Sequence, residues 1–402
     1  MKTEVINQVS DRLNRLSESA TIAMARKSRE LKNQGVDVIS LSLGEPDYFT
    51  PDFIKKAAVE AIDQNYTKYM AVNGYEDLRE AISHKFKRDN NLNYNINQIV
   101  VSTGAKQSIA NVVMSVVNPG DEVIIPAPYW VTYEEIVKMA EGIPVIIEAS
   151  IENDFKIKAK ELSDAISEKT RLMIYSSPCN PTGSVFSENE LSDLADVISK
   201  HPNLIVISDE IYEHINFVGH HTSLAQFNEV YDQVVTVNGV SKAFAMTGWR
   251  LGYIGAPKWI ADACTKIQGQ FTSGASSISQ RAALAAVQAD PIVTFEMRDA
   301  FKKRRELVLE KLNEIPGVVS NIPEGAFYVF PDISAFFGLS FKEYTINDAD
   351  DLSLYLLSES NVALVTGSAF GAPNCIRLSY AASEEELVEA LKRIKEALLK
   401  LS

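Results

Sequence analysis

Short apolar runs alternate with longer stretches of mixed polarity through the middle of the chain. The runs lie at residues 99–102, 122–125, 171–175, 204–208, 234–237 and 253–255. They are rich in Val and Ile, and the stretches between them are long enough for helices. Strands that alternate with helices build a mostly parallel sheet with helices on both faces. The pattern therefore predicts an α/β domain.

The pattern changes after about residue 290. A charged, helix-like stretch at 298–313 is followed by short apolar runs at 318–320, 327–330, 362–365 and 376–379. These runs predict the strands of a smaller α+β unit. We expect residues 1–50 to pack with this unit, residues 51–290 to form the large domain and residues 291–402 to form the small one, so that the small domain draws on both chain ends.

The end of the chain carries the clearest helix signal. Ser383 and Glu386 have the spacing of a capping box, in which each side chain bonds the other's backbone N–H. Leu387, Leu391 and Ile394 then recur on one helical face. The pattern predicts a helix that begins after Ser383 and buries this face.

Composition narrows the function classes. A chain of 402 residues is longer than one ordinary core requires, and a net charge of -14 argues against nucleic acid as a partner. Three scattered cysteines do not form a disulfide framework, the five histidines form no metal-ligand pattern, and no apolar run is long enough to cross a bilayer. Residues 1–8 lack the apolar core of a signal peptide. We expect a cytoplasmic protein without a metal ion or a membrane partner.

Lys242 and Arg250 share a run of small and apolar residues at 239–252, directly after a predicted strand. One interpretation is a solvated lysine and a surface ion-pair partner. The glycines and apolar residues around them favour another, in which the lysine forms a Schiff base and the arginine binds a phosphate. A cofactor with an aldehyde and a phosphate, pyridoxal 5'-phosphate, meets both requirements.

Asp209 ends one of the most apolar runs, and Tyr212 follows three residues later. A carboxylate at such a place needs a cationic partner, and a protonated pyridine nitrogen is one. Tyr212 can donate to the phenolate oxygen of the same ring. The alternative is that Asp209 and Glu210 cap a following helix.

Two turns at strand ends carry further candidates. Asn180 is flanked by Pro178 and Pro181, which restrict its backbone and can direct its amide into a site. Gly104 and Ala105 lie where a strand passes into a helix, and small residues there let backbone N–H groups approach an anion. Each turn is also compatible with an ordinary connection.

Three more residues have chemistry to explain. Trp130, like its neighbour Tyr129, offers a plane that can stack on a flat ring, although a lone Trp is more often part of a core. Gly44 can bring its backbone close to a ligand. Arg377 lies inside an apolar strand and needs a carboxylate, from a protein Asp or from a substrate, and the strand alone does not decide between them.

Together, these motifs resemble the class I/II aminotransferases, which are fold-type-I pyridoxal phosphate enzymes, and most closely their prokaryotic aspartate aminotransferase branch. The resemblance extends from the Gly-Glu-Pro-Asp at 44–47 to Arg377. It implies a seven-stranded, mostly parallel sheet in the large domain. It also implies a homodimer with shared active sites, in which Tyr69 reaches the phosphate bound by the other subunit.

The resemblance also implies a role for each candidate. Lys242 would form the internal aldimine and then move the proton, while Asp209 pairs with the ring nitrogen and Tyr212 with Asn180 holds the phenolate oxygen. The remaining cofactor contacts would come from Trp130 on the ring and from Gly104, Ala105, Lys106, Ser241 and Arg250 around the phosphate. The substrate contacts would come from Gly44, Asn180 and Arg377 at the α-carboxylate and from Lys106 and Trp130 at a distal carboxylate.

The resemblance implies ping-pong transamination between L-aspartate and 2-oxoglutarate. Aromatic, alanine-like or prephenate substrates are the alternative, and a carbon–sulfur lyase on the same fold is another. Some relatives that accept prephenate carry a basic residue before Ser-Ala-Thr, where this chain has Glu18. A regulator without catalysis is disfavoured, since no basic module is attached. We also expect cis peptide bonds at Ala127–Pro128 and Asn180–Pro181.

Overall fold

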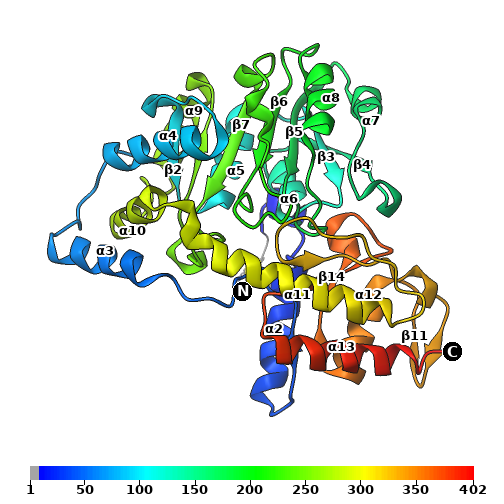
Figure 1. Ribbon diagram of the computed structural model, residues 1–402. Coiled ribbons are helices and arrows are strands. Elements are labelled where there is room, and N and C mark those ends of the chain that lie inside the picture. The colour runs from blue at the N-terminus through cyan, green and yellow to red at the C-terminus, as the bar shows by residue number, and fades with distance from the viewer. Residues whose placement is uncertain (1–8) are drawn as a thin grey trace, which may run out of the picture.

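The computed structural model of the chain describes residues 9–402. Residues 1–8, the start of the segment 1–50, lie outside the described residues. The expectation that they form no signal peptide therefore stays a prediction. Figure 1 shows a layered body of strands and helices above a second group of elements formed by α2, α11, α12 and α13. Within residues 9–402, no helix combines the length and the apolar character needed to cross a bilayer.

The upper body is built on a seven-stranded sheet with the order β2-β8-β7-β6-β5-β3-β4. Its strands are β2 (Ile99–Ser102), β3 (Glu122–Ala127), β4 (Ile143–Glu148), β5 (Thr170–Ser176), β6 (Ile205–Asp209), β7 (Val234–Gly239) and β8 (Gly252–Gly255). Strands β3 to β7 pair in parallel, and β8 runs antiparallel to both neighbours. The α/β fold with a mostly parallel seven-stranded sheet is confirmed. Its edge strand β4 was not among the predicted runs.

Helices cover both faces of this sheet, because its strands alternate their side chains between two cores. Val123 and Ile125 of β3 belong to one core, and Ile124 belongs to the other. The first core receives α5 (Ala105–Val116), α6 (Thr132–Met139) and α9 (Lys258–Phe271). The second receives α3 (Asp52–Asp63), α4 (Glu76–Asn90), α7 (Ala159–Ala165), α8 (Glu188–Ile198) and α10 (Ser277–Gln288).

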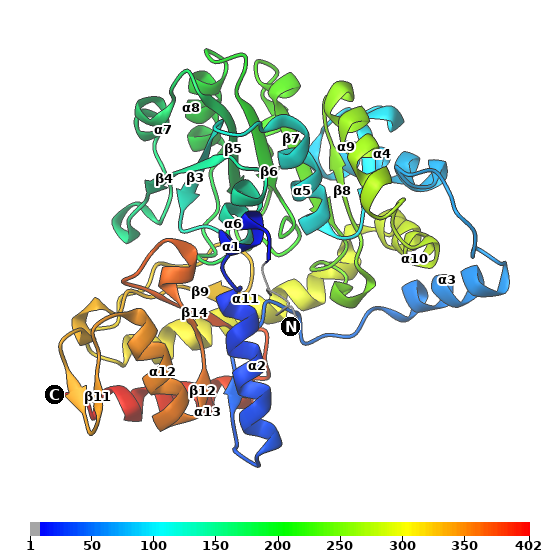
Figure 2. The same ribbon diagram turned by 180° about the vertical axis from the view of Figure 1, so that it is seen from behind.

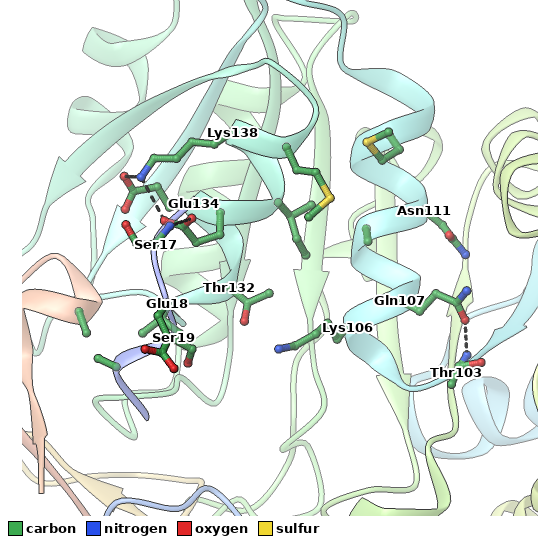
Figure 3. A pocket seen from close by; sticks show the side chains of 18 of the residues that line it. Ser17, Glu18, Ser19, Thr103, Lys106, Gln107, Asn111, Thr132, Glu134 and Lys138 are labelled. Atoms are coloured by element: carbon green, nitrogen blue, oxygen red, sulfur yellow. Dashed lines mark hydrogen bonds and ion pairs between the residues drawn. The ribbon is translucent and has the colours of Figure 1, made fainter. Parts of the chain in front are cut away.

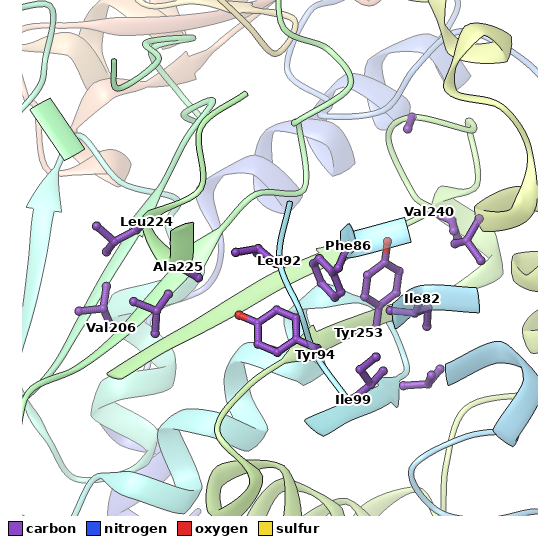
Figure 4. Packing of buried hydrophobic residues seen from close by; sticks show 14 of the residues in the cluster. Ile82, Phe86, Leu92, Tyr94, Ile99, Val206, Leu224, Ala225, Val240 and Tyr253 are labelled. Atoms are coloured by element: carbon purple, nitrogen blue, oxygen red, sulfur yellow. The ribbon is translucent and has the colours of Figure 1, made fainter. Parts of the chain in front are cut away.

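Aromatic rings fill the second core beneath α4 (Figure 4). Phe86 meets Tyr94 and Tyr253 edge to face, with ring centroids 5.1 and 5.7 Å apart. Complete burial of one such side chain contributes about 1.5–3 kcal/mol. This packing fixes α4 on β2 and β8, at the β2 edge of the sheet.

The lower group of elements has its own core and its own small sheets. Its helices are α2 (Ala20–Asn33), α11 (Phe295–Asn313), α12 (Ala349–Ser360) and α13 (Glu384–Leu398). Its strands are β1 (Ile39–Ser40), β9 (Tyr328–Val329), β10 (Ser340–Phe341), β11 (Tyr344–Thr345), β12 (Val362–Ala363), β13 (Val365–Thr366) and β14 (Ile376–Ser379). Strand β1 pairs with β12, so the N-terminal segment and the C-terminal part of the chain share a sheet. Figure 2 shows the N-terminal helix α2 beside β12.

The predicted C-terminal strands are only partly right. The run 376–379 forms β14, but 362–365 divides between β12 and β13, which pair with different partners. The run 318–320 is not a strand. Val319 makes a single bridge to Asp332 and is 56% exposed, so no ladder or buried face holds it. Helix α13 and its Ser383–Glu386 capping box are confirmed.

Candidate active site

A cavity of about 310 Å³ lies where the carboxyl ends of β5, β6 and β7 meet the lower group of elements. Open α/β sheets bind ligands at this end of their strands. Most of the candidates from the sequence line it. They are Gly44, Ala105, Lys106, Trp130, Asn180, Asp209, Tyr212, Ser241, Lys242, Arg250 and Arg377. Gly104 and Tyr69 do not line this cavity.

Gly104 shapes the cavity from behind. It is the N-cap of α5, with φ of 84°, a backbone conformation that favours glycine. A side chain on Gly104 would collide with the Arg250 guanidinium, and one on Gly252 would collide with the backbone of Gly104 and Ala105. The glycines thus let the arginine and the first N–H groups of α5 converge, which is an arrangement suited to an anion.

Lys242 follows β7 by three residues and points at the chain segment after β1. Its Nζ donates to the Gly44 carbonyl oxygen across 2.6 Å and lies 5.7 Å from the centre of the Tyr212 ring. Burial lowers the pKa of Lys242 to about 8, with Glu45 acting in the opposite direction. At this pKa, roughly a tenth of the amine is neutral at pH 7, against less than about a thousandth for an ordinary lysine, and the neutral form is the one that a nucleophile or a base requires.

Asp209 is the last residue of β6 and is buried. Tyr133 on α6 donates to its Oδ2 across 2.6 Å, and the Ile211 N–H donates to its Oδ1 across 3.3 Å. Burial raises the pKa of Asp209 to about 6, against the effect of these hydrogen bonds. The alternative that Asp209 caps a helix is wrong, because turns follow β6 directly. Tyr133 was missed by the sequence analysis.

Arg377 is fully buried in β14 and reaches across to the turn after β5. Its Nη1 donates to Asn180 Oδ1 across 2.8 Å, and its Nη2 donates to the Ser42 carbonyl oxygen across 2.6 Å. Its Nε has no partner, and no carboxylate of residues 9–402 forms an ion pair with it. Of the two partners left open by the sequence, a protein Asp is therefore not used.

Tyr212 contacts a residue that the sequence analysis did not single out. Its Oη lies 2.8 Å from the Oη of Tyr328, which comes from β9 of the lower group. Both side chains are buried. The two tyrosines are 116 residues apart, so no local pattern links them.

Lys106 marks the opening to a second, larger cavity of about 1100 Å³ (Figure 3). Both cavities are lined by Ser19, Lys106, Thr132 and Arg250, while Asp209, Lys242 and Arg377 line only the smaller one. The Lys106 Nζ lies 4.9 Å from the centre of the Trp130 ring. Burial, and then the charge of Arg250, lower the pKa of Lys106.

Tyr69 is 95% exposed. It comes from the segment between α3 and α4 and contributes to neither cavity. Within a single chain, the structure does not bring Tyr69 to the other candidates.

A buried ionic cluster begins at Glu210, the residue that follows Asp209 in the chain. Glu210 is 3.1 Å from His221 Nε2, while Glu213 contacts both Lys85 and His214. These side chains include two groups whose ligand atoms are close enough together for a metal ion. The Lys85 ammonium already supplies positive charge to Glu213, so the cluster is consistent with an ion-pair network, and the expected absence of a metal stays a prediction.

Two cis prolines border the site, and one prediction about them is wrong. Ala127–Pro128 is cis as predicted, but the second cis bond is Ser177–Pro178, and Asn180–Pro181 is trans. The cis and trans forms of an X–Pro bond differ by only about 0.5–1 kcal/mol, so packing selects the isomer. Two prolines three positions apart are thus not distinguished by their sequence.

The chain matches the family model described as aminotransferase class I and II over residues 36–394. A bifunctional aspartate aminotransferase and glutamate/aspartate-prephenate aminotransferase of Petunia hybrida is 48% identical, over 99% of this chain and 84% of its own length. The aspartate aminotransferase structure from Rhizobium meliloti superposes with a TM-score of 0.95 at 41% identity, over 98% of this chain and 100% of that one. The Thermus thermophilus aspartate aminotransferase with maleate gives a TM-score of 0.92 at 38% identity, with the same coverage. Since the family model covers residues 36–394 and the fold is shared over nearly the whole chain, the chain belongs to the class I and II aminotransferases.

Proposed function

We propose that this protein is a pyridoxal phosphate-dependent aminotransferase that exchanges the amino group between L-aspartate and 2-oxoglutarate. The observation that carries the proposal is one cavity in which the Lys242 amine, the Asp209 carboxylate and the Arg377 guanidinium come together. Each of these groups is held without the partner that its charge or chemistry requires. An aldehyde, a ring cation and a substrate carboxylate are the three missing partners.

The residues present fit the cofactor. Asp209 is a buried carboxylate whose pKa is raised to about 6, and a protonated pyridine nitrogen would supply the missing cation. The glycine-lined gap between Arg250 and the N-terminus of α5, with Ser241 beside it, fits a phosphate. Asn180 donates no hydrogen bond from its amide nitrogen to the protein within residues 9–402, so that group is available to a ring oxygen.

When bound, pyridoxal phosphate supplies an aldehyde that takes up amino groups and a ring that accepts electrons from Cα. Lys242 would hold the aldehyde carbon in the resting enzyme, and its amine, once released, would move a proton to and from Cα. Asp209 would keep a proton on the ring nitrogen, while Tyr212 and Asn180 would hold the ring oxygen. Trp130 would pack on the ring. General acid–base catalysis by a residue such as Lys242 raises the reaction rate by about 10²–10⁴-fold.

The substrate contacts follow from two cations of the cavity, Arg377 and Lys106. Arg377 and Asn180 bind the α-carboxylate, with the Gly44 backbone beside them, and Arg377 stays in place because Asn180 and Ser42 already orient its guanidinium. Lys106, over the Trp130 ring, meets the distal carboxylate of aspartate or glutamate. A dicarboxylic substrate thus finds one cation at each end.

Other amino-group partners are the second candidate, because the Petunia relative is named for prephenate as well as aspartate. In this chain, the position before Ser-Ala-Thr is held by Glu18, which lines the larger cavity and pairs with Arg26 across 2.6 Å, so this position offers an additional carboxylate a negative charge and not a cation. We therefore rank prephenate below aspartate. Aromatic and alanine-like substrates, and a carbon–sulfur lyase activity, remain alternatives to be tested with the same panel.

We further propose a homodimer with shared sites. Large apolar side chains are exposed on and near α3, among them Phe49, Phe53, Ile62 and Tyr69. An exposed apolar surface of this kind is typical of a protein interface. A partner subunit would cover it and bring its own Tyr69 toward the phosphate. Since Cys179, Cys264 and Cys375 form no disulfide, we expect the enzyme to work in the reducing cytoplasm.

A steady-state panel tests the proposal. Purified holoenzyme is assayed with aspartate, alanine, phenylalanine and glutamate as donors and with 2-oxoglutarate, pyruvate and prephenate as acceptors. We expect aspartate with 2-oxoglutarate to have the highest kcat/KM and to give the parallel double-reciprocal lines of a ping-pong reaction. A higher kcat/KM for prephenate would favour the second candidate. Pyruvate, ammonia and a thiol released in equal amounts from an added S-alkylcysteine, without an oxo-acid acceptor, would favour a lyase.

A further inference from the structure

Tyr328 brings a hydroxyl group from the lower group of elements to the wall of the active-site cavity. Its Oη lies 2.8 Å from Tyr212 Oη, and the centre of its ring lies 4.5 Å from the Arg377 guanidinium carbon. Strand register explains the second contact. Tyr328 pairs with Ser379 of β14, and Arg377 is two residues from Ser379, on the same face. Tyr328 thus touches both Tyr212 and Arg377.

The position of this hydroxyl is narrowly fixed. A side chain on Gly44 would collide with Tyr328 Oη, so the glycine backbone packs directly against it. The Gly44 carbonyl oxygen in turn accepts the hydrogen bond from Lys242. The Tyr328 hydroxyl therefore lies between Tyr212 on one side and the Gly44 backbone on the other, and it cannot turn away without displacing one of them.

Each tyrosine has one hydroxyl proton. Only one of these two protons can lie in the hydrogen bond between the Tyr212 and Tyr328 oxygens. Tyr328 is 0% exposed, and the protein offers it no acceptor other than Tyr212 within the described residues. If Tyr212 donated to Tyr328, the Tyr328 proton would be buried without a partner, which proteins avoid. If Tyr328 donates, its proton is satisfied and the Tyr212 proton is left for a ligand in the cavity.

The charges around the pair favour the same direction. Burial raises the pKa of both hydroxyls and takes that of Tyr212 well above its usual value. The Arg377 charge opposes this effect at both, but at Tyr328, whose ring lies against the guanidinium, it is the largest opposing cause, whereas at Tyr212 the Asp209 charge adds to the effect of burial. The more acidic hydroxyl is the better donor, and here that hydroxyl belongs to Tyr328.

We propose that Tyr328 is a positioning residue that donates its hydroxyl proton to Tyr212 Oη and so directs the Tyr212 proton at the ring oxygen of the cofactor. The inference rests on the proposed function, since it concerns how Tyr212 meets that ring. It assigns Tyr328 no contact with the reacting atoms. The hydroxyl acts only through Tyr212, and the ring acts only as a surface for Arg377.

Removal of the Tyr328 hydroxyl is expected to change kcat and the pH midpoint of the cofactor absorbance, and to leave KM nearly unchanged. In Tyr328→Phe the ring under Arg377 remains, so the KM for aspartate changes little. Tyr212 loses the donor that orients it, and kcat falls by roughly two- to tenfold, the range expected for one neutral hydrogen bond. A weaker donor at the ring oxygen disfavours the more anionic form of the bound cofactor. The pH midpoint of its visible absorbance change therefore rises, by roughly half a pH unit to one pH unit.

The test is a double-mutant cycle with a spectroscopic readout. Tyr212→Phe, Tyr328→Phe and the double variant are loaded with pyridoxal phosphate, and the pH midpoint of the visible band is measured for each. Tyr380→Phe is the matched control, because Tyr380 is also fully buried and donates instead to the Ala326 carbonyl oxygen. Gly44→Ala displaces the Tyr328 hydroxyl without removing it and serves as a second variant if Tyr328→Phe does not fold.

We expect Tyr328→Phe and Gly44→Ala to raise the midpoint, Tyr380→Phe to leave it unchanged, and the double variant to match Tyr212→Phe alone. An unchanged midpoint in Tyr328→Phe, or additive shifts in the double variant, would overturn the inference. Cofactor-free protein provides an independent arm, in which coupled melting temperatures of the same three variants support the hydrogen bond and additive ones contradict it. Failure to bind the cofactor at all would count against the proposed function instead.

Discussion

Arg377 and Asn180 are 197 residues apart, yet their side chains are joined by a 2.8 Å hydrogen bond from Nη1 to Oδ1. The arginine comes from β14 and the asparagine from the turn after β5, so the bond links the two bodies of the chain. Both residues are buried, and Arg377 has no carboxylate partner among residues 9–402. The pair is oriented for a carboxylate that the protein does not supply.

This arrangement predicts that Arg377→Lys impairs substrate binding more than it impairs stability. Lysine keeps the charge but loses the planar fork that matches a carboxylate. We expect kcat/KM for aspartate to fall by about ten- to a hundredfold, the loss of one charge-assisted hydrogen bond or more, mainly through KM. Steady-state kinetics measures it. Arg393→Lys is the control, since Arg393 lies on α13 and already pairs with two carboxylates, Asp37 and Glu389. An equal loss of kcat/KM in this control would contradict a specific role of Arg377 in substrate binding.

Lys106 is predicted to select dicarboxylic substrates. In Lys106→Ala the distal carboxylate loses its cation, whereas alanine has no such group to lose. We expect the ratio of kcat/KM for aspartate to that for alanine to fall by about tenfold or more. The control is Lys138→Ala. Lys138 lines the larger cavity but not the smaller one, and its charge is already paired with Glu134 across 2.8 Å. An unchanged ratio in Lys106→Ala would remove Lys106 from the specificity site.

Asp209 makes the stability of the cofactor-free protein depend on pH. Burial raises its pKa from 3.8 to about 6. The folded state thus binds more protons between these values, and stability is lost as pH rises through about 6. In the cofactor-free state, Asp209→Asn is therefore expected to gain stability relative to wild type between pH 4 and pH 7, by about 2 kcal/mol. Urea unfolding at the two pH values measures the gain, and an equal difference at both would contradict it.

Tyr69 is predicted to act in the partner's site, and mixed dimers test this. Tyr69→Ala and Lys242→Ala are each expected to be nearly inactive. When the two are unfolded and refolded together, a mixed dimer has one site with wild-type Lys242 and a wild-type Tyr69 from the partner. Random mixing restores about a quarter of wild-type activity. No recovery would mean that each Tyr69 serves its own chain, where it is 95% exposed.

The apolar runs predicted six of the seven strands of the central sheet, because buried strands carry a strong local signal, and they missed the edge strand β4, whose residues are partly or fully exposed. The cavity residues Lys242, Asp209 and Arg377 were also predictable, since each is a charged or reactive group at an otherwise apolar strand or its end. The isomers of Pro178 and Pro181 were not, since packing decides between two nearly equal local states.

Contacts between distant residues were the other gap. Tyr133 meets Asp209 over a separation of 76 residues, and Tyr328 meets Tyr212 over 116. Neither tyrosine differs locally from a core tyrosine, and only the tertiary fold brings their hydroxyls to the site. A partial signal existed for Tyr133, which lies only three residues after Trp130 in the sequence, and the two rings meet edge to face with centroids 5.6 Å apart.

The most direct test of the account is a half-reaction without any oxo-acid acceptor. Holoenzyme is mixed with aspartate alone, and the visible absorbance of the bound cofactor and the released oxaloacetate are both followed. We predict that the absorbance is lost, that one oxaloacetate appears for each active site, and that 2-oxoglutarate then restores the absorbance, whereas Lys242→Ala does none of this. Absorbance that does not respond to aspartate, or a product formed continuously without an acceptor, would contradict the proposed transamination.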